Sequence, residues 1–478
     1  MKKNVWFALT AALLFLSGCT GSTNTQTERT AQTALTQTEE LLPSSASPSL
    51  RLCSSEEELA AAFSGREERQ SELQFVNRGS CCAEPVAVAG DVAYILRDYG
   101  VELVSLRSTG AVKLSTLSVG YVWEETDSEA QWSGSEKQCT ALLLYEERLV
   151  VLSDQYVYSI GSGEEGWQSR DSSRCTVDIY DISEPTAPKW MRSFSQTGSE
   201  SGCLVSDGLL YLVTDREIYG DDTLCEATLP GWWQGESWTA LPLSRVYLCE
   251  GGTASYLQLG IYELETASEP DGCALVGCGT EALLCERGLY ALIPGEEGSA
   301  VYYLPVKEGS IAEPVASRLS ESYGSVSELT GAGESLCLLR AGSTILEGRD
   351  WQRRFGENRL LTLTLRENTV ELALFSLDEP TEPIAARMLG YDLHAAVEED
   401  RAVFTDADSG LIGLPAEDGY TLYRWDGESF LHVLDCYSSD FSGNRRTILT
   451  ADTLFVTDKK HVFTIDLQGE RLISTLTF

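Results

Sequence analysis

The sequence predicts an all-β protein, a β-propeller of seven four-stranded blades with a short N-terminal helix in front of it; six or eight blades are the alternatives. Three observations predict this fold. One apolar strand phrase recurs seven times, helical periodicity is nearly absent after Phe63, and more than 400 residues remain once the N-terminal segments are set aside. A chain of that length exceeds the roughly 250–300 residues that one hydrophobic core accommodates, so a repeat architecture or several domains are needed.

The N-terminus has the features of a lipoprotein signal peptide, which we assign to residues 1–18. Lys2 and Lys3 precede Val5–Leu16, an uncharged apolar run that is shorter than the about 20 residues of a transmembrane helix. The run ends in residues 16–19 (LSGC), which resemble a lipobox. We expect cleavage before Cys19 and lipidation of its thiol, which would anchor the chain to the cell membrane on the extracytoplasmic side. A buried N-terminal helix is the alternative.

Three further segments follow the signal peptide. Residues 19–50 are rich in Thr, Ser, Gln and Glu and contain few large apolar residues, a composition that predicts a lipidated, flexible tether. Residues 51–80 predict a short helical lead-in, and residues 81–478 the β-propeller domain. No other segment has 18 uncharged apolar residues in a row, so no transmembrane helix is expected beyond the signal peptide.

The repeat consists of an apolar patch, a polar or acidic turn, and a strand of the form Leu-Tyr-Leu-Val. Its seven copies are centred on Asp91–Ile95, Arg148–Leu152, Gly208–Val213, Gly288–Leu292, Ser335–Leu339, Arg401–Phe404 and Thr453–Val456. Partner strands follow at Val177–Tyr180, Val301–Leu304, Leu360–Leu363, Leu372–Phe375 and His461–Ile465. A spacing of roughly 50–80 residues accommodates a four-stranded antiparallel blade with its loops, and seven such units would close a ring.

A second internal match contains paired prolines. Tyr180–Pro188 (YDISEPTAP) aligns with Phe375–Pro383 (FSLDEPTEP), and each copy follows one strand and precedes another. Proline fixes φ and cannot donate a ladder hydrogen bond. The phrase is therefore expected in the connection between the third and the outermost strand of a blade, as a structural motif.

Together these residues resemble a known family. Val177–Pro185, followed by Leu209–Thr214 (LLYLVT), is similar to secreted prokaryotic proteins whose C-terminal part is a β-propeller distantly related to WD repeats. Leu52–Leu59 resembles the short helix that precedes the propeller in that family, and Val370–Pro383 resembles its late strand-and-turn phrase. The resemblance runs from about Arg51 to the end and fits less well in the first blade and at 217–300. It implies a propeller exposed on the cell envelope and assigns no catalytic residues.

The net charge limits the classes of partner that the protein is expected to bind, and the cysteine count limits its disulfides. The net charge of −38 makes nucleic acid and anionic membrane surfaces unfavourable partners, and the acidic residues are scattered through turns as on a solvated surface. Fourteen cysteines less the lipidated one leave 13, an odd number, so at least one thiol of a monomer stays unpaired. Cys175, Cys203, Cys285 and Cys337 lie in apolar strand patterns and are expected to be buried thiols, whereas adjacent Cys81 and Cys82 could supply a disulfide.

Signatures of catalysis are sparse. His394, His432 and His461 are the three histidines; the last two lie in apolar strand patterns, and none belongs to a Gly-x-Ser-x-Gly setting. We predict no catalytic residue and no cofactor. Asp406 and Asp408 could bind calcium through alternating carboxylates, although the later glutamate of an EF-hand loop is missing and a plain turn is the alternative.

The segment from Gly220 to Leu241 fits the repeat poorly and carries Trp232, Trp233 and Trp238. These rings could stack on a sugar or anchor a protein partner, or they could pack the loop onto the blade. The leading hypothesis is a membrane-anchored binding or scaffold module for an envelope protein or glycan. An envelope hydrolase or lyase with carboxylates in the central channel and a sensory domain of an envelope signalling system are the alternatives.

Overall fold

The structure is a computed structural model of the whole chain. It describes residues 38–40, 48–66, 73–78, 84–119, 122–124, 132–163, 166–169, 172–218, 228–235, 237–278, 281–293, 299–318, 337–339, 351–356, 358–377, 381–398, 402–437, 445–458 and 460–478. Among these residues, no helix has the length and apolar character needed to cross a membrane. The signal peptide, Cys19 and most of the predicted tether lie outside the described residues.

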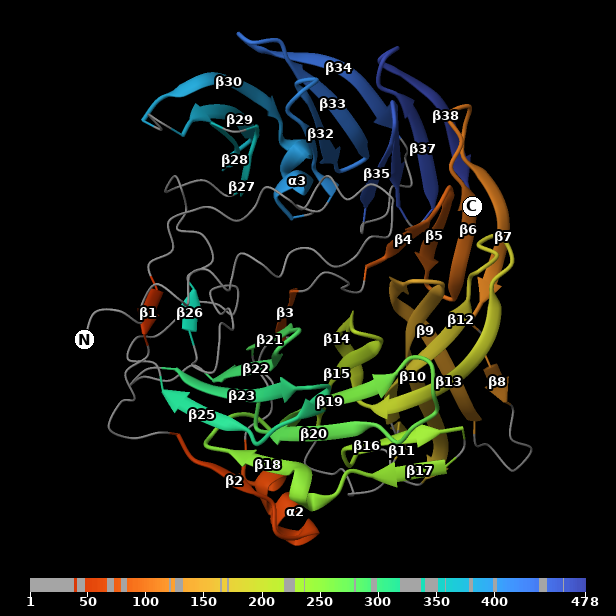
Figure 1. Cartoon of the computed structure of the whole chain (residues 1–478), viewed down its shortest axis with the longest axis vertical. Coiled ribbons are helices and arrows are strands. Elements are labelled where there is room, and N and C mark those ends of the chain that lie inside the picture. Colours follow the sequence, from red (N-terminus) through yellow and green to blue (C-terminus); the bar gives the residue numbers. More distant parts are fainter. Residues whose placement is uncertain are drawn as a thin grey trace.

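The described residues form seven sheets that contain four or more strands each, in chain order around the molecule (Figure 1). Four sheets have four antiparallel strands in simple meander order: β4–β7 (Val86–Ala89, Val92–Arg97, Gly100–Ser105, Val112–Ser118), β27–β30 (Trp351–Arg354, Arg359–Arg366, Thr369–Ser376, Pro383–Gly390), β31–β34 (Phe404–Asp406, Leu411–Ala416, Gly419–Trp425, Phe430–Tyr437) and β35–β38 (Arg446–Thr450, Thr453–Thr457, His461–Asp466, Arg471–Thr477). These are the first, fifth, sixth and seventh sheets.

The other three sheets carry added strands. The second contains β8 (Val122–Glu124), β9 (Trp132–Tyr145), β10 (Arg148–Gly163), β11 (Gly166–Ser169), β12 (Ser172–Asp181), β13 (Lys189–Thr197), β16 (Gly231–Gln234) and β17 (Ser237–Ala240). The third contains β14 (Ser199–Ser206), β15 (Leu209–Glu217), β19 (Ser255–Glu263), β20 (Asp271–Val276), β18 (Val246–Cys249) and β2 (Leu50–Leu52). The fourth contains β3 (Gln74–Arg78), β21 (Glu281–Cys285), β22 (Gly288–Ile293), β23 (Ala300–Lys307), β24 (Ser310–Ile311) and β25 (Val315–Arg318).

Neighbouring sheets pack face to face through apolar clusters, as a propeller requires. The second sheet packs on the third through Val150, Leu152, Val177 and Leu212, and similar clusters join the first sheet to the second, the third to the fourth, the fifth to the sixth and the sixth to the seventh. The ring closes where Ile95 and Val104 of the first sheet pack on Phe455 and Val462 of the seventh. The all-β propeller prediction is confirmed. Residues 319–336 and 340–350 lie outside the described residues, so a count of seven blades stays a prediction for the whole chain.

The repeat phrase coincides with the second strand of a sheet in five places, namely β5, β10, β15, β22 and β36. Two copies fall elsewhere. Ser335–Leu339 contains β26 (Cys337–Leu339), which pairs with β1 (Thr38–Glu40) outside the seven sheets, and Arg401–Phe404 runs into β31, a first strand. The second strands of the fifth and sixth sheets are β28 and β32, whose interior residues are also buried. Strands buried on both faces lack an alternating pattern, so their order in a blade cannot be read from polarity.

The first copy of the proline phrase lies where it was predicted, with Pro185 and Pro188 between β12 and β13. In the second copy Pro383 is the first residue of β30, and residues 378–380 lie outside the described residues. Residues 182–188 connect β12 to β13 and residues 377–382 connect β29 to β30, in each case the third strand to the outermost of its four-stranded meander. The same strand pair carries a β-bulge in five sheets, the first, second, fifth, sixth and seventh. A bulge bends one strand and increases the local twist, so the recurring bulge lets each outermost strand curve along the rim (Figure 1).

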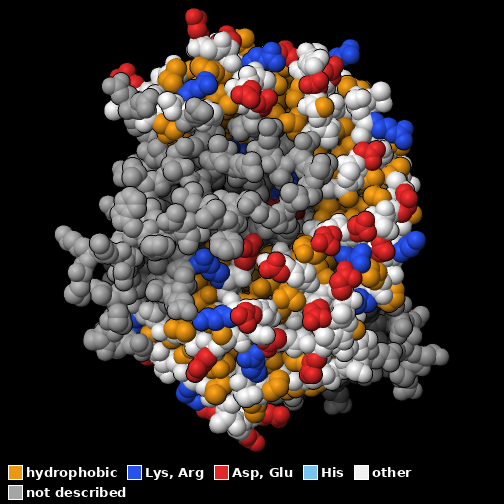
Figure 2. Space-filling view, in the orientation of Figure 1, with side chains coloured by type: hydrophobic (Ala, Val, Ile, Leu, Met, Phe, Trp, Pro, Cys, Tyr) orange, Lys and Arg blue, Asp and Glu red, His pale blue; other side chains and the backbone are white. Residues whose placement is uncertain are grey.

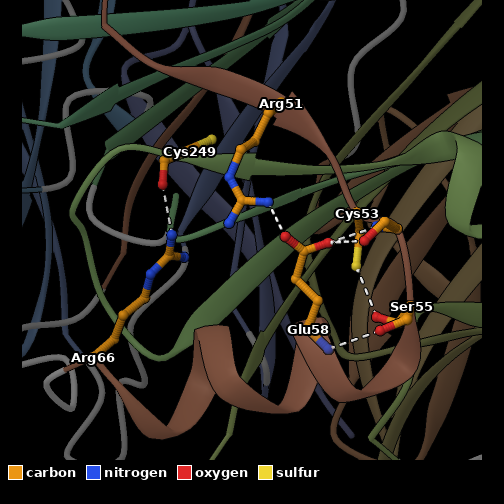
Figure 3. Close-up of polar contacts among 7 residues, drawn as sticks. Arg51, Cys53, Ser55, Glu58, Arg66 and Cys249 are labelled. Atoms are coloured by element: carbon orange, nitrogen blue, oxygen red, sulfur yellow. Dashed lines mark hydrogen bonds and ion pairs between the residues drawn. The ribbon is translucent and has the colours of Figure 1, made fainter.

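The short N-terminal helix is also confirmed as α2 (Glu56–Ser64); α3 (Ala395–Glu398) is a single turn that follows a 3₁₀ turn at Tyr391–His394, and a further 3₁₀ turn spans Leu243–Arg245. Ser55 caps α2 by accepting a hydrogen bond from the Glu58 backbone N–H at 3.2 Å. The Glu58 carboxylate accepts hydrogen bonds from the backbone N–H and the hydroxyl of Ser54 and pairs with Arg51, and these contacts lower its pKa to about 2 (Figure 3). Three acidic residues in the first turn also favour the helix dipole.

Candidate binding surface

The tryptophan-rich insertion forms a hairpin on the rim of the second sheet. Its strands β16 and β17 extend that sheet beyond β13, with Gln196 opposite Trp232 and Ser195 opposite Trp233. The meander β9, β10, β12, β13 already supplies four strands, so the hairpin is an addition to the blade. Residues 219–227 of the insertion lie outside the described residues.

Buried amide side chains hold the hairpin in place. Gln258 of the third sheet bonds both backbone groups of Gly231, accepting from its N–H at 2.9 Å and donating to its carbonyl at 3.2 Å. Gln196 of the second sheet donates to the Thr214 hydroxyl at 2.8 Å and accepts from the Tyr262 hydroxyl at 2.8 Å. Both glutamines are fully buried. Because a buried polar group without a partner costs about 1–3 kcal/mol, this satisfied network fixes one position for the hairpin.

The three tryptophans occupy two faces of the hairpin. Trp232 is 4% exposed and packs with Phe63, Tyr256 and Leu241 in the cluster beneath α2. Trp233 and Trp238 are cross-strand partners on the opposite face, with ring centroids 6.4 Å apart, and both are half-buried. This division follows from the strand period of two, which sends neighbouring side chains to opposite faces.

A guanidinium group completes the surface. The Arg174 guanidinium lies over the Trp233 ring, 5.3 Å from its centroid, and its Nε donates to the Gln155 side-chain oxygen at 2.8 Å. Gln155 and Arg174 are directly opposite on β10 and β12, so the long strands of the second sheet position the cation. We call Arg174, Trp233 and Trp238 the Trp–Arg patch. It combines two aromatic rings and one positive charge on a rigid support.

Two carboxyl groups, those of the buried Asp154 and the half-buried Glu200, lie beside this support. Asp154 of β10 is 5% exposed, and its Oδ1 accepts a hydrogen bond from the Glu200 backbone N–H at 2.8 Å. Burial raises the pKa of Asp154 well above its ordinary value and raises the pKa of Glu200 to about 7, although a hydrogen bond with Thr140 opposes the latter shift. Glu200 belongs to β14, which lies near the middle of the ring (Figure 1).

Asp154 and the hairpin share one rung of the second sheet. Across it lie Asp154, Cys175, Gln196 and Trp232, each directly opposite the next. Burial raises the pKa of the Cys175 thiol, and the neighbouring acidic groups Asp154 and Glu200 raise it further. Sequence reasoning missed the acid pair because its members are 46 residues apart; the available signal was a carboxylate directly after the apolar strand LVVLS.

Asp406 and Asp408, the residues predicted as possible calcium ligands, make local contacts within their own turn. The Asp406 carboxylate accepts hydrogen bonds from the Asp408 backbone N–H at 3.2 Å and the Ser409 hydroxyl at 2.5 Å, in the turn between β31 and β32. Within the ranges that the structure describes, no group of three or more His, Cys, Asp or Glu side chains could hold a metal ion. Calcium at this turn stays a prediction.

Each histidine has a partner within a few residues. The ring of His394 contacts the Tyr391 carbonyl at 2.8 Å, His432 contacts Asp435 at 2.9 Å, and His461 contacts Asp458 at 3.2 Å. These contacts serve a 3₁₀ turn, the outermost strand of the sixth sheet and the turn before β37. Each histidine is therefore engaged by a neighbour in its own local segment.

The nine cysteines with described side chains are all thiols. Cys175 and Cys203 are fully buried in the cluster between the second and third sheets, as expected, and Cys285 is half-buried. The side chain of Cys337, and Cys81 and Cys82, lie outside the described residues.

Figure 2 shows acidic, basic and apolar side chains interspersed over the visible face, as expected for a solvated surface.

A family model described as a β-propeller domain matches residues 88–328. Among solved structures, AztD from Citrobacter koseri is 13% identical with a TM-score of 0.28, covering 83% of this chain and 94% of that chain. The uncharacterized protein lmo1340 from Listeria monocytogenes is 9% identical with a TM-score of 0.30, covering 84% of this chain and 97% of that chain. No curated protein matches the sequence. Since the family model spans half of the chain, the protein belongs to the β-propeller domain family.

Proposed function

We propose that this protein is a membrane-anchored, extracytoplasmic lipoprotein whose propeller binds an envelope protein or glycan. The lipobox-like residues 16–19 support lipidation at Cys19, and the polar segment that follows supports a tether of about 30 residues with a reach of roughly 30 Å. The partner therefore lies near a membrane surface. The net charge of −38 argues against nucleic acid as the partner.

The Trp–Arg patch carries this proposal. Its hairpin is an addition to a complete four-stranded meander, and the buried Gln258 side chain bonds both backbone groups of Gly231 in that hairpin. Tryptophan and arginine are enriched among the residues that dominate binding energy, especially on rigid supports where little conformational entropy is lost. Indole rings suit the apolar face of a sugar or of a partner side chain, and the Arg174 guanidinium suits a carboxylate or hydroxyl beside it.

The test compares Trp233→Ala and Trp238→Ala with Trp190→Ala, which removes a 61%-exposed ring from the far end of β13. Each full-length protein is incubated with cross-linked envelope extracts and with a glycan array. We expect one partner that binds the wild type and Trp190→Ala and is lost at least tenfold from both patch variants. A partner that binds all four proteins equally, or no partner at all, would overturn the proposal.

A second candidate function, an envelope hydrolase or lyase, is favoured by the Asp154 and Glu200 pair. A carboxyl with a pKa of about 7 near the middle of the ring suits general acid catalysis, and the carboxyl of Asp154 accepts a hydrogen bond from the backbone N–H of the same residue. Glu200→Gln keeps the shape of the side chain and removes its proton transfer. An activity on envelope polysaccharide that this variant loses would support an enzyme, and an activity that it retains would exclude this pair.

A further inference from the structure

Two cysteines meet at the point where the N-terminal lead-in joins the ring. Cys249 ends β18, and Cys278 lies two residues beyond β20, the strand that pairs with β18 in parallel. Their sulfur atoms are 3.1 Å apart, and both residues are buried, 3% and 1% exposed. The positions are close in space although the chain makes two strands, β19 and β20, between them.

Strand β18 lies next to the edge strand β2 and receives several of the contacts that fasten the lead-in. Other contacts join Phe63 to Tyr256 of β19 and β3 to β21 of the fourth sheet. β2 pairs with it in antiparallel register, with Leu50 opposite Cys249. Arg66, which follows α2, donates from Nη2 to the Cys249 carbonyl at 2.5 Å (Figure 3). The α2 residues Leu59 and Phe63 pack with Val246 and Leu248 of β18.

β18 itself is held to the sheet by a short ladder. It pairs with β20 at three positions, from Val246 to Leu248, and has β2 on its other side. A pull on the tether would reach β18 through β2 and α2. A covalent link from β18 to the end of β20 would transfer that load to the third sheet, whose strands β15 and β19 pair over nine positions.

We propose that Cys249 and Cys278 form a disulfide that fastens the N-terminal lead-in to the third sheet. The sulfur atoms must approach by about 1 Å to reach the bond length of ~2.05 Å. Because both thiols are buried in the folded sheet, the bond forms during folding, before β2, α2 and Arg66 cover β18.

The chemistry is thiol–disulfide exchange with an external disulfide. The Cys249 thiolate attacks one sulfur of that disulfide, a mixed disulfide forms, and one thiolate leaves. The Cys278 thiolate then attacks the Cys249 sulfur, the protein disulfide forms, and the second thiolate leaves. Two cysteine thiols are oxidised, one external disulfide is reduced to two thiols, and the two protons end on the leaving thiolates.

The inference rests on the proposed extracytoplasmic location only for the supply of the oxidant, so the test supplies glutathione disulfide directly. The full-length protein is unfolded in denaturant with reductant, refolded in detergent with a glutathione redox buffer, alkylated and digested. We expect mass spectrometry to find the Cys249 and Cys278 peptides linked. Cys249→Ser and Cys278→Ser should each lose the link, and Cys436→Ser, a buried cysteine of the sixth sheet, should keep it.

Two results would overturn the proposal: alkylated Cys249 and Cys278 in a chain with native circular dichroism, or a link from Cys249 to Cys273. The fastening role has its own readout. Reduction should speed hydrogen exchange in β2 and α2 by about tenfold in the wild type and leave the Cys249→Ser variant unchanged. Equal exchange in the reduced and oxidised wild type would refute the fastening role. The binding experiments on the Trp–Arg patch are unaffected by either outcome.

Discussion

The raised pKa of Glu200 should make the free energy of unfolding depend on pH. Burial moves its pKa from an ordinary value of 4.5 to about 7, so the folded state binds the proton more tightly than the unfolded state. The protonated Glu200 carboxyl therefore contributes stability that is fully present below about pH 4.5 and is lost as pH rises through 7. At 1.36 kcal/mol for each pH unit between the two values, the loss is about 3 kcal/mol. The raised pKa of Asp154 changes stability in the same direction.

Urea unfolding of the wild type and Glu200→Gln between pH 4.5 and pH 8 measures this loss. The variant cannot ionise, so we expect it to match the wild type at pH 4.5 within about 1 kcal/mol and to exceed it at pH 8 by about 2–3 kcal/mol. Glu367→Gln, in the exposed turn between β28 and β29, is the matched control and should follow the wild type. A Glu200→Gln variant that loses as much stability as the wild type across this range would refute the reasoning.

Three further substitutions test other parts of the structure by urea unfolding. Gln258→Ala removes the partner of the Gly231 N–H and leaves the Gly231 carbonyl to the Thr197 hydroxyl, so it should cost about 1–3 kcal/mol, with faster hydrogen exchange in β16; unchanged exchange would contradict the docking role. Phe63→Ala, at a ring that is 4% exposed, should cost about 3–5 kcal/mol, and a loss below 1 kcal/mol would mean that α2 is not packed on the third sheet. Gly277→Ala forces a side chain into a backbone with φ of +95° and against the Arg66 guanidinium, so it should cost at least 1 kcal/mol, and a neutral result would contradict the position of Arg66.

Local chemistry made some connections between strands and the start of the helix predictable from the sequence. Paired prolines cannot donate to a ladder, and Pro185 and Pro188 lie in the connection between the third and outermost strands, whereas Pro383 is the first residue of the outermost strand β30. The resemblance of Leu52–Leu59 to the short helix of the family likewise predicted α2, which Ser55 caps. The order of strands within the fifth and sixth sheets was not predictable, since β28 and β32 are as apolar as the phrase chosen to mark second strands.

The candidate site was predictable only in part, for a physical reason. The tryptophan segment stood out by composition, but only the hairpin register shows that Trp232 is core and that Trp233 and Trp238 form the outer face. The partners that give the site its character come from distant positions. Arg174 reaches Trp233 across 59 positions of the chain (233 − 174), and no local pattern encodes such a contact.

Photo-cross-linking from position 238 tests the central claim most directly. Trp238 is replaced by the photoreactive residue p-benzoylphenylalanine in the full-length protein on intact cells, and position 190 serves as the exposed control on the same sheet. We predict that irradiation links position 238, and not position 190, to one envelope protein or glycan, and that adding Trp233→Ala abolishes the adduct. No adduct at position 238, or the same adducts at both positions, would contradict a binding role for the Trp–Arg patch.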